Sequence, residues 1–291
     1  MSSIPRIKPK CIIFDLDNTL YDWVSFFVPS FYAMVEEVIN ITGWEREELL
    51  DGFKYVHQRH NNVEHPFSLL EVDLVQQQYG NLSKQELSKI FDSAFLAFNR
   101  MRKKTLEAYP DVKEVLNSVN EAGIDIIAHT DSSLYAVVDR MERIGLTKFF
   151  NRIYCRGRSA SEHPDGHPFA NWAQDFPFDK VVELPPNEKK PDPSVLLDIC
   201  STQGHLPTET AYVGDSLARD ILMAHKTGVI SIWAKYGTHH PSKMYEMLVR
   251  VTHWTHDDVI RERSLSKEVR SVTPDFVLEK GIKELTTVIN I

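Results

Sequence analysis

A ten-residue segment near the start of the chain, Cys11 to Leu20 (CIIFDLDNTL), restricts the possible folds most strongly. Its first four residues are apolar, β-branched or aromatic, which is typical of a central parallel strand that is buried on both faces. Asp15 and Asp17 follow where such a strand leaves its sheet, and open α/β sheets carry their ligand sites at the carboxyl ends of parallel strands. Two adjacent carboxylates need a cation or a proton. Taken alone, the segment fits an ordinary strand that ends in an Asx-type turn equally well.

Three further apolar runs of the chain also end in polar residues. The run 123–130 leads into a turn that is rich in hydroxyl groups, and such a turn can present backbone N–H groups to an anion at the start of a helix. A second polar turn carries two lysines and two prolines before a predicted helix, and a third strand-like run, TAYV, closes on a glycine and two acids. In chain order these residues are Thr130, Asp131, Ser132 and Ser133; Lys189 and Lys190; and Gly214, Asp215 and Asp220.

This ordered set resembles the haloacid dehalogenase superfamily, which has a DxDxT motif, a Thr or Ser after a second strand, a lysine, and a GDxxxxD-type acidic motif. Each motif is weak alone, but the ordered set is specific. Lys190 is preferred to Lys189 as the motif lysine because it precedes Pro191. The resemblance covers about 8–22, 108–155 and 186–235, together with 274–285. The matching residues are Asp15, Asp17, Thr19, Thr130, Lys190, Gly214, Asp215 and Asp220.

The alternation of strand and helix patterns predicts an α/β fold with a doubly wound parallel sheet. The segment 22–108 instead shows helical patterns over 23–41, 45–60, 67–79 and 83–105, with a capping-box spacing at Ser83 and Glu86. By resemblance to the family, we expect a Rossmann-like catalytic core made of residues 1–21 and 109–291. The same resemblance implies that residues 22–108 form an inserted α-helical cap domain.

The residue types define the expected chemistry. Asp15 would attack a phosphoryl group and form an aspartyl-phosphate, and Asp17 would act first as an acid and then as a base. The resemblance implies that Mg²⁺ is bound by the side chains of Asp15 and Asp215 and by the backbone carbonyl of Asp17, while Asp220 organises the acidic loop. Thr130 and Lys190 would hold the phosphoryl group. Further candidate contacts to substrate or phosphate are Asn18, Thr19, Tyr21 and Asp131.

An acid at position 17 is suited to protonating an alkoxide leaving group, so it favours phosphoester chemistry over the dehalogenase and phosphonate branches. The sequence therefore predicts a Mg²⁺-dependent phosphatase of a small phosphomonoester, such as a nucleotide or a sugar phosphate. Two alternatives stay open: a phosphotransferase or mutase of the same superfamily, and a catalytically silent member that serves as a binding module.

Composition excludes several other classes of protein. The formal net charge is −8, from 33 basic and 41 acidic residues, which disfavours binding to a nucleic acid polymer. The three cysteines lie far apart and predict neither disulfides nor a zinc site, which favours the reducing cytoplasm. We also expect no leader and no membrane span, because the start of the chain has no long apolar region and no 18-residue apolar run follows. No oligomeric state is predicted.

Two segments are longer than is usual in the family, and their roles are not predicted. Residues 156–188 contain His163, Asp165 and His167, for which a solvent-exposed loop is favoured over a metal site. Residues 237–273 contain a charged run and are expected to form surface helices.

Overall fold

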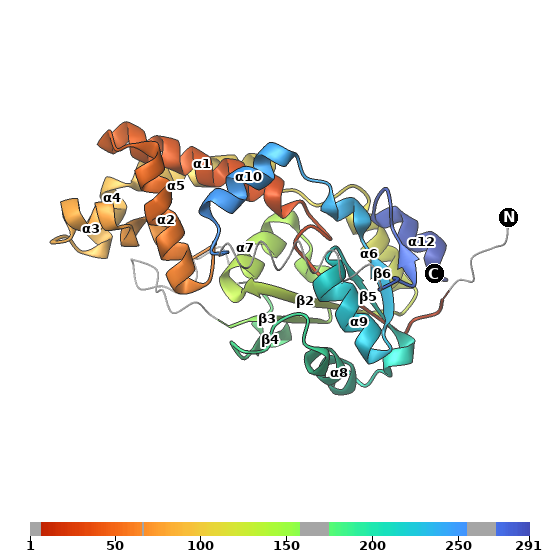
Figure 1. The fold of residues 1–291 in the computed structure, drawn as a ribbon. Helices are drawn as coiled ribbons and strands as arrows, with labels where there is room; N and C mark the ends of the chain where they lie inside the picture. The colour runs from red at the N-terminus through yellow and green to blue at the C-terminus, as the bar shows by residue number, and fades with distance from the viewer. Residues whose placement is uncertain (1–6, 66, 158–174, 255–271) are drawn as a thin grey trace.

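The computed structural model of the chain describes residues 7–65, 67–157, 175–254 and 272–291. These residues form one parallel sheet with the strand order β4-β3-β2-β1-β5-β6-β7 (Figure 1). The predicted doubly wound parallel sheet is thereby confirmed. The strands are β1 (Cys11–Phe14), β2 (Asp125–Ser133), β3 (Arg152–Arg156), β4 (Val181–Leu184), β5 (Thr210–Gly214), β6 (Ile230–Trp233) and β7 (Phe276–Val277).

The central strand β1 is buried on both faces, as its uninterrupted apolar sequence predicts. Successive side chains of a strand point to opposite faces of its sheet. Ile12 and Phe14 accordingly belong to the larger hydrophobic core, whereas Cys11 and Ile13 belong to a second, smaller one. None of the four is more than 1% exposed. Parallel pairing with β2 and β5 fixes the direction of the strand and so fixes the edge at which Asp15 leaves the sheet.

Helices cover both faces of the sheet (Figure 1). Buried residues of α6, α7 and α12 share the larger core with one face of β1, and buried residues of α8 and α9 share the smaller core with the other face. The helices of this part are α6 (Val112–Glu121), α7 (Leu134–Ile144), α8 (Pro193–Thr202), α9 (Leu222–Thr227) and α12 (Leu285–Val288). Short 3-10 turns are η2 (Thr147–Phe149), η4 (Phe178–Lys180), η5 (Pro207–Glu209), η7 (Lys235–Thr238) and η9 (Ile282–Glu284), and η6 (Leu217–Ile221) is a π-helical turn.

The segment between β1 and α6 is helical throughout its described regular elements. The predicted capping box is present, since the Ser83 hydroxyl accepts from the backbone N–H of Glu86 and the Glu86 carboxylate accepts from that of Ser83. Two predicted helices are each divided in two, the second of them at Phe91, whose backbone leaves helical geometry. The elements are α1 (Trp23–Thr42), α2 (Arg46–His60), η1 (Ser68–Glu71), α3 (Asp73–Tyr79), α4 (Lys84–Ile90) and α5 (Asp92–Thr105).

Helix α10 (Ser242–Val251) lies against α1 and α2, although it follows the sheet strands in sequence (Figure 1). It buries Val251, and its carbonyl groups accept hydrogen bonds from that helical segment: the Tyr32 hydroxyl donates to Met247 at 3.0 Å. The Nδ1 atom of His57 lies 2.6 Å from the carbonyl oxygen of Val251. Only Leu248 and Val251 of α10 are buried, and its other residues are exposed or half-buried. Within 237–273, α10 is therefore the surface helix that was expected, with its apolar stripe packed on the helices of 23–60.

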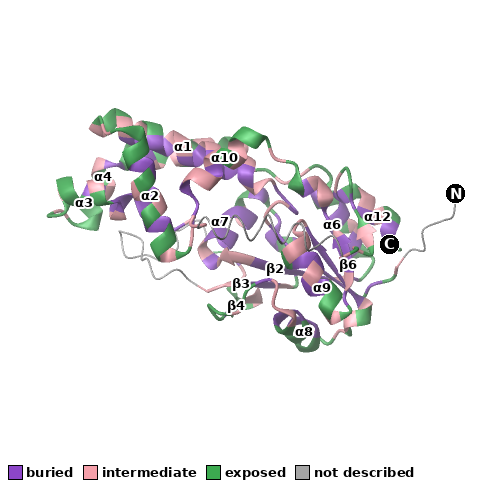
Figure 2. Ribbon diagram, in the orientation of Figure 1, coloured by how far each residue is buried: buried purple, intermediate pink, exposed green. Residues whose placement is uncertain are grey.

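The predicted absence of a long apolar run is also corrected. Helix α1 is long and apolar enough to cross a membrane, with a mean hydropathy of 1.3 over its best window. Half of that window is buried inside the structure, where Phe26, Phe27 and Phe31 join the core and the helix packs on α5 (Figure 2). The helix therefore has the burial of an internal helix.

Other expectations concern single residues. The three cysteines are buried and free, as predicted. Burial raises the pKa of the Cys155 thiol to about 12, which keeps this thiol unreactive. His163, Asp165 and His167 lie outside the described residues.

Candidate active site

The site lies where the chain order of the sheet changes direction. Strand β1 has β2 on one side and β5 on the other, which makes the carboxyl ends of β1 and β5 the topological switch point of the sheet. Asp15 follows β1 directly and Asp215 follows β5, so both carboxylates emerge at this edge. The backbone N–H of Asp15 donates to the carbonyl of Val213 at 2.9 Å, which extends the pairing of the two strands up to the acid.

Three acids and one lysine meet at this edge, and we call Asp15, Asp215, Asp220 and Lys190 the carboxylate cluster. One carboxylate oxygen from each acid lies within 4.8 Å of the others. The Lys190 ammonium donates to Oδ1 of Asp15 and, at 2.8 Å, to Oδ1 of Asp220. Lys190 is 7% exposed, whereas Lys189 is exposed to solvent, so Lys190 is the lysine that reaches the acids.

The carboxylate cluster has more negative charge than its lysine can neutralise. Burial raises the pKa of Asp15 to about 7, Lys190 opposes that shift, and Asp220 and Asp17 add to it. Partial burial and the neighbouring carboxylates likewise raise the pKa of Asp215 well above its ordinary range. Three carboxylates and one ammonium leave a formal charge of −2 in a set of hard oxygen donors. These residues therefore fit a divalent cation of the Mg²⁺ type.

Asp220 differs from the other two acids in its hydrogen bonds. Its Oδ1 accepts from Lys190, and its Oδ2 accepts from the backbone N–H of Ser216 at 3.0 Å. Gly214 allows this arrangement, because a Cβ atom at that position would lie 2.4 Å from the Asp220 carboxyl group. Two engaged oxygens suit the predicted role of Asp220 as an organiser of the loop rather than a direct ligand.

The Asp17 carboxylate is held apart from the carboxylate cluster. Its Oδ2 accepts from the Ser132 hydroxyl at 2.6 Å, and its Oδ1 accepts from the guanidinium of Arg140. The same guanidinium donates to Glu64 and, at 3.3 Å, to the Tyr21 hydroxyl. Arg140 is only 2% exposed; burial opposes its charge, but Asp17 and Glu64 keep its pKa well above the ordinary value.

The hydroxyl-rich turn after β2 is more extended than predicted. The strand continues to Ser133, with a shift of register against β3 between His129 and Ser133. Thr130 is buried, and its Oγ1 accepts from the backbone N–H of Ser132 at 3.1 Å. The Oδ1 atom of Asp131 accepts from the backbone N–H of Lys190 at 3.1 Å, which ties this turn to the segment that carries the lysine.

The remaining predicted contacts lie around the turn after Asp15. The Thr19 hydroxyl points to Oδ2 of Asp15 at 3.4 Å, and Asn18 has a left-handed backbone with φ 59°. The Asn18 Oδ1 atom accepts from the backbone N–H of Trp23 at 3.1 Å. Tyr21 is fully buried beside Arg140, so its predicted contact with substrate has no open path in this conformation.

Arg140 and Glu64 were missed by the sequence reasoning. Arg140 lies on the apolar stripe of α7, three residues after Val137 and four before Ile144, both of which are buried. A charged residue on such a stripe is rarely buried without a partner, which is the signal that could have revealed it. Glu64 has no comparable signal, because it lies between α2 and η1 in a segment without periodicity.

Comparisons with known proteins point to the same family as the order of the motifs. The family model of haloacid dehalogenase-like hydrolases matches residues 9–228. The chain is 24% identical over 232 residues to a glyceraldehyde 3-phosphate phosphatase of Methanopyrus kandleri, covering 78% of this chain and 84% of that protein. It is also 24% identical over 231 residues to a phosphoglycolate phosphatase of Vibrio vulnificus, covering 79% and 86% respectively.

Solved structures share the fold. A 2-haloacid dehalogenase from Pseudomonas syringae pv. Tomato superposes with a TM-score of 0.53 at 18% identity, covering 96% of this chain and 97% of that one. A HAD phosphatase from Thermococcus onnurineus gives 0.51 at 16% identity, with the same coverage.

Proposed function

We propose that this chain, which belongs to the haloacid dehalogenase-like hydrolase family, is a metal-dependent phosphatase that hydrolyses a small phosphomonoester. The predicted family and hydrolase class are thus confirmed. One observation carries the proposal: the carboxylate cluster of Asp15, Asp215 and Asp220 stays negatively charged around the buried Lys190 at the switch point of the sheet. A site of this kind binds a cation and a phosphate together.

Asp15 is the proposed nucleophile. Its carboxylate oxygen attacks phosphorus while the bond from phosphorus to the ester oxygen breaks, which leaves an aspartyl-phosphate and the alcohol. Water then attacks the phosphorus of this intermediate and releases phosphate and free Asp15. The bond between Asp15 Oδ1 and Lys190 supports this assignment, because the ammonium lies where negative charge would gather on the nucleophile and on the phosphoryl oxygens.

Asp17 is the proposed acid and base. It donates a proton to the leaving alkoxide and later takes one from the attacking water, so its side chain must stay free of the metal. Its bonds to Ser132 and Arg140 support that role, since they hold the carboxylate away from the carboxylate cluster.

The proposed ion is Mg²⁺, held by the side chains of Asp15 and Asp215 and by the backbone carbonyl of Asp17. When bound, it offsets the charge of nucleophile and phosphate and orients the two. Thr130, Asp131, Asn18 and Thr19 are the proposed positioning groups around the phosphoryl oxygens. The placement of Thr19 beside Asp15 supports this arrangement.

The helical segment 22–108 is the proposed cap over a core made of residues 1–21 and 109–291. The ion pair between Glu64 of that segment and Arg140 of α7 supports a cap that reaches the site. The names of the two relatives favour small phosphorylated metabolites as substrates, and the hydrolase family favours transfer to water over phosphomutase chemistry. Three free, buried cysteines suit the proposed cytoplasmic location.

The test is hydrolysis of p-nitrophenyl phosphate by the purified chain with Mg²⁺, with EDTA, and as the Asp15→Asn variant. We expect turnover that requires the metal and falls by at least about 10⁴-fold in the variant, because the nucleophile is lost. Turnover that persists in Asp15→Asn would reject Asp15 as nucleophile. Absence of turnover with any phosphate ester and Mg²⁺ would leave the catalytically silent alternative.

The role of Asp17 has its own test. Asp17→Ala should slow ethyl phosphate by roughly 10²- to 10⁴-fold and p-nitrophenyl phosphate far less, because p-nitrophenolate leaves without a proton. Equal losses for both esters would contradict acid catalysis by Asp17.

A further inference from the structure

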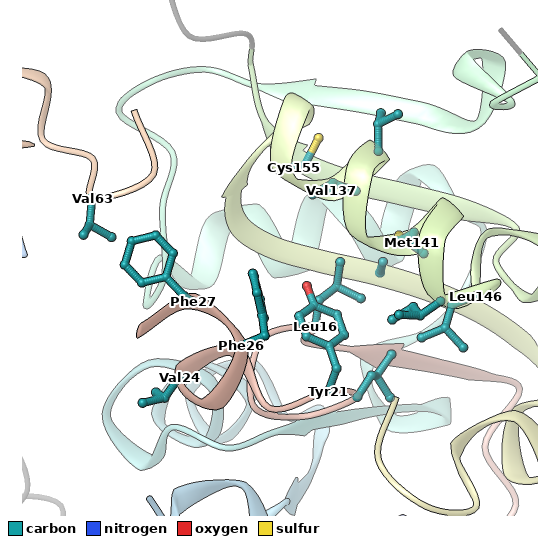
Figure 3. Packing of buried hydrophobic residues seen from close by; sticks show 14 of the residues in the cluster. Leu16, Tyr21, Val24, Phe26, Phe27, Val63, Val137, Met141, Leu146 and Cys155 are labelled. Atoms are coloured by element: carbon teal, nitrogen blue, oxygen red, sulfur yellow. The ribbon is translucent and has the colours of Figure 1, made fainter. Parts of the chain in front are cut away.

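A cavity of about 180 Å³ lies beside the site, between the helical segment 22–108 and α7. Aromatic rings from successive turns of α1 and α5 form a large part of its wall. Figure 3 shows two of these rings, Phe26 and Phe27, with Val63 on the far side of Phe27 and Leu16 and Tyr21 beside Phe26. The aromatic lining residues are Phe26, Phe27, Phe31, Phe67, Phe95, Phe98 and Tyr135.

The cavity adjoins the proposed acid. Arg140 and Glu64 both line it, and the guanidinium of Arg140 is bonded to Glu64 and to the Asp17 carboxylate. One planar group therefore separates the cavity wall from the carboxylate that would protonate the leaving oxygen. The carbon skeleton attached to that oxygen lies on this side of the site.

The charges of the cavity wall are already paired among the described residues. Arg102 donates to Asp139 at 2.6 Å, and Arg140 donates to Glu64. These four charged lining groups sum to zero, and His65, which also lines the cavity, is bonded to Glu71 at 2.8 Å. A carboxylate or a second phosphate on the leaving group would enter an aromatic wall without an unpaired cation, at a large cost of desolvation.

The size and polarity of the cavity define the kind of ligand that it can hold. A cavity of roughly 150 Å³ is large enough to bind benzene, so this partly open cavity of about 180 Å³ has room for a single aromatic ring or a branched alkyl group. One buried donor, the Nε of Arg102, has no hydrogen-bond partner among the described residues, and a hydroxyl or carbonyl on the ligand would satisfy it.

We propose that this cavity binds the leaving group, and that the preferred substrates are phosphomonoesters of uncharged alcohols with an aromatic or bulky apolar group. This inference rests on the proposed function and narrows it. It separates the chain from enzymes that release glycolate, because glycolate carries a carboxylate.

The experiment compares kcat/KM for 2-phenylethyl phosphate, ethyl phosphate and 2-phosphoglycolate with Mg²⁺. The first two release similar alkoxides, so their ratio reports binding of the phenyl ring rather than acid assistance. We expect 2-phenylethyl phosphate to exceed ethyl phosphate by roughly 10- to 100-fold, as the burial of one ring predicts, and to exceed 2-phosphoglycolate as well.

Two variants test whether the preference for the phenyl ring arises in this cavity. Ala136→Leu adds bulk at a cavity-lining position of α7 and should bring the ratio close to one, whereas Ala97→Leu, on α5 but outside the lining, should preserve it. Should Ala136→Leu fail to fold, Phe98→Ala is the second variant. It enlarges the cavity and should raise kcat/KM for 2-(2-naphthyl)ethyl phosphate relative to 2-phenylethyl phosphate.

The outcomes are separable. Hydrolysis of all three esters without preference for the phenyl group, or with 2-phosphoglycolate preferred, overturns the cavity inference and leaves the proposed function standing. Hydrolysis of none of the three while p-nitrophenyl phosphate is turned over also overturns the cavity inference. Hydrolysis of none, with p-nitrophenyl phosphate inert as well, rejects the proposed function. In that case binding of 2-phenylethanol is measured instead. Saturable binding that is lost in Ala136→Leu and kept in Ala97→Leu still supports binding of the leaving group in the cavity. Absence of such binding overturns the inference.

Discussion

In the described part of the chain, two groups of side chains are close enough to hold a metal ion, and they differ in how their charge is balanced. One is the carboxylate cluster at the end of β1 and β5. The other, the histidine cluster, consists of His60, His65 and Glu71 with Arg59 beside them. In each, potential ligand atoms lie within 4.8 Å of one another. Distance alone therefore ranks the two groups equally.

The histidine cluster is electrostatically satisfied. Both Nε2 atoms lie 2.8 Å from the Glu71 carboxylate, which also accepts from Arg59. Burial opposes ionisation of Glu71, but these hydrogen bonds prevail and lower its pKa to about 2. The two imidazole rings stack with centroids 3.5 Å apart and planes 7° from parallel, and both Nε2 atoms are already bonded to Glu71.

The carboxylate cluster is the opposite case, because the pKa of Asp15 rises to about 7 and that of Asp215 rises as well. A raised carboxyl pKa means that the folded chain holds an unsatisfied negative charge, which is the condition that a cation relieves. The direction of the pKa shift, and not the proximity of the ligands, distinguishes a functional cluster from a structural one.

The largest expected difference between the clusters is catalytic. Asp215→Asn should lower kcat/KM for p-nitrophenyl phosphate by roughly 10³-fold or more, because it removes a proposed metal ligand. Glu71→Gln should leave that value within about threefold, as expected for a residue remote from the reaction. Similar losses of kcat/KM in both variants, measured at saturating Mg²⁺, would contradict the proposed difference between the two clusters.

Metal-dependent stability is the next test. At a Mg²⁺ concentration near 100 times its Kd, the folded chain should gain about 2.7 kcal/mol, measured by thermal or urea unfolding. The gain should persist in Glu71→Gln and vanish in Asp215→Asn. A gain that is lost in Glu71→Gln would place the ion in the histidine cluster.

The pH dependence sharpens the same comparison. Asp15 has a folded-state pKa of about 7 against 3.8 when unperturbed, so the folded chain binds this proton more tightly than the unfolded chain. The stability from that proton is complete below about pH 4 and is lost as pH rises through 7. Because Mg²⁺ competes with the proton, its apparent affinity at pH 5.5 should be lower than at pH 7 by roughly 15-fold.

Calorimetric titration of Mg²⁺ at several pH values measures this effect. Asp15→Asn has no carboxyl proton at that position and should show a flatter profile. A wild-type affinity that does not change over this range would contradict the raised pKa.

The smallest expected effect is structural. Glu71→Gln keeps the shape of the side chain but loses its charge-assisted hydrogen bonds, so the free energy of unfolding should fall by about 1 kcal/mol. The matched control Glu48→Gln, at an exposed position of α2, should change it by less than about 0.5 kcal/mol. Urea unfolding measures both, and equal effects would show that Glu71 is not a structural anchor.

Local sequence was sufficient for the elements that set the edge of the sheet. The apolar run 11–14 can only be a buried strand, and the polar residues after it must then lie at its carboxyl end. The same reasoning brought Lys190 and Asp220 to the site, where they contact each other. Strand direction and motif order fix positions without any knowledge of packing, so the sequence could bring these side chains together, while their roles stay predictions.

Pairing between distant elements could not be predicted in this way. Strand β2 runs past Thr130 to Ser133 because its partner β3 determines where pairing ends. The contact of Arg140 with Glu64 depends on how α7 meets the segment after α2, and no spacing in the sequence encodes it. The packing of α10 on α1 and α2 likewise depends on tertiary contacts, which no spacing in the sequence encodes.

Helix α10 has a mechanical consequence for the proposed cap. A body joined to its neighbour by two chain connections, at 21–22 and 108–109, can pivot about the line through both. Here the side chains of Tyr32 and His57 also form hydrogen bonds to the backbone of α10. Helix α10 follows β6 in the chain. A third attachment restricts that pivot. If the helical segment moves away from the sheet, α10 must either move with it or lose these hydrogen bonds.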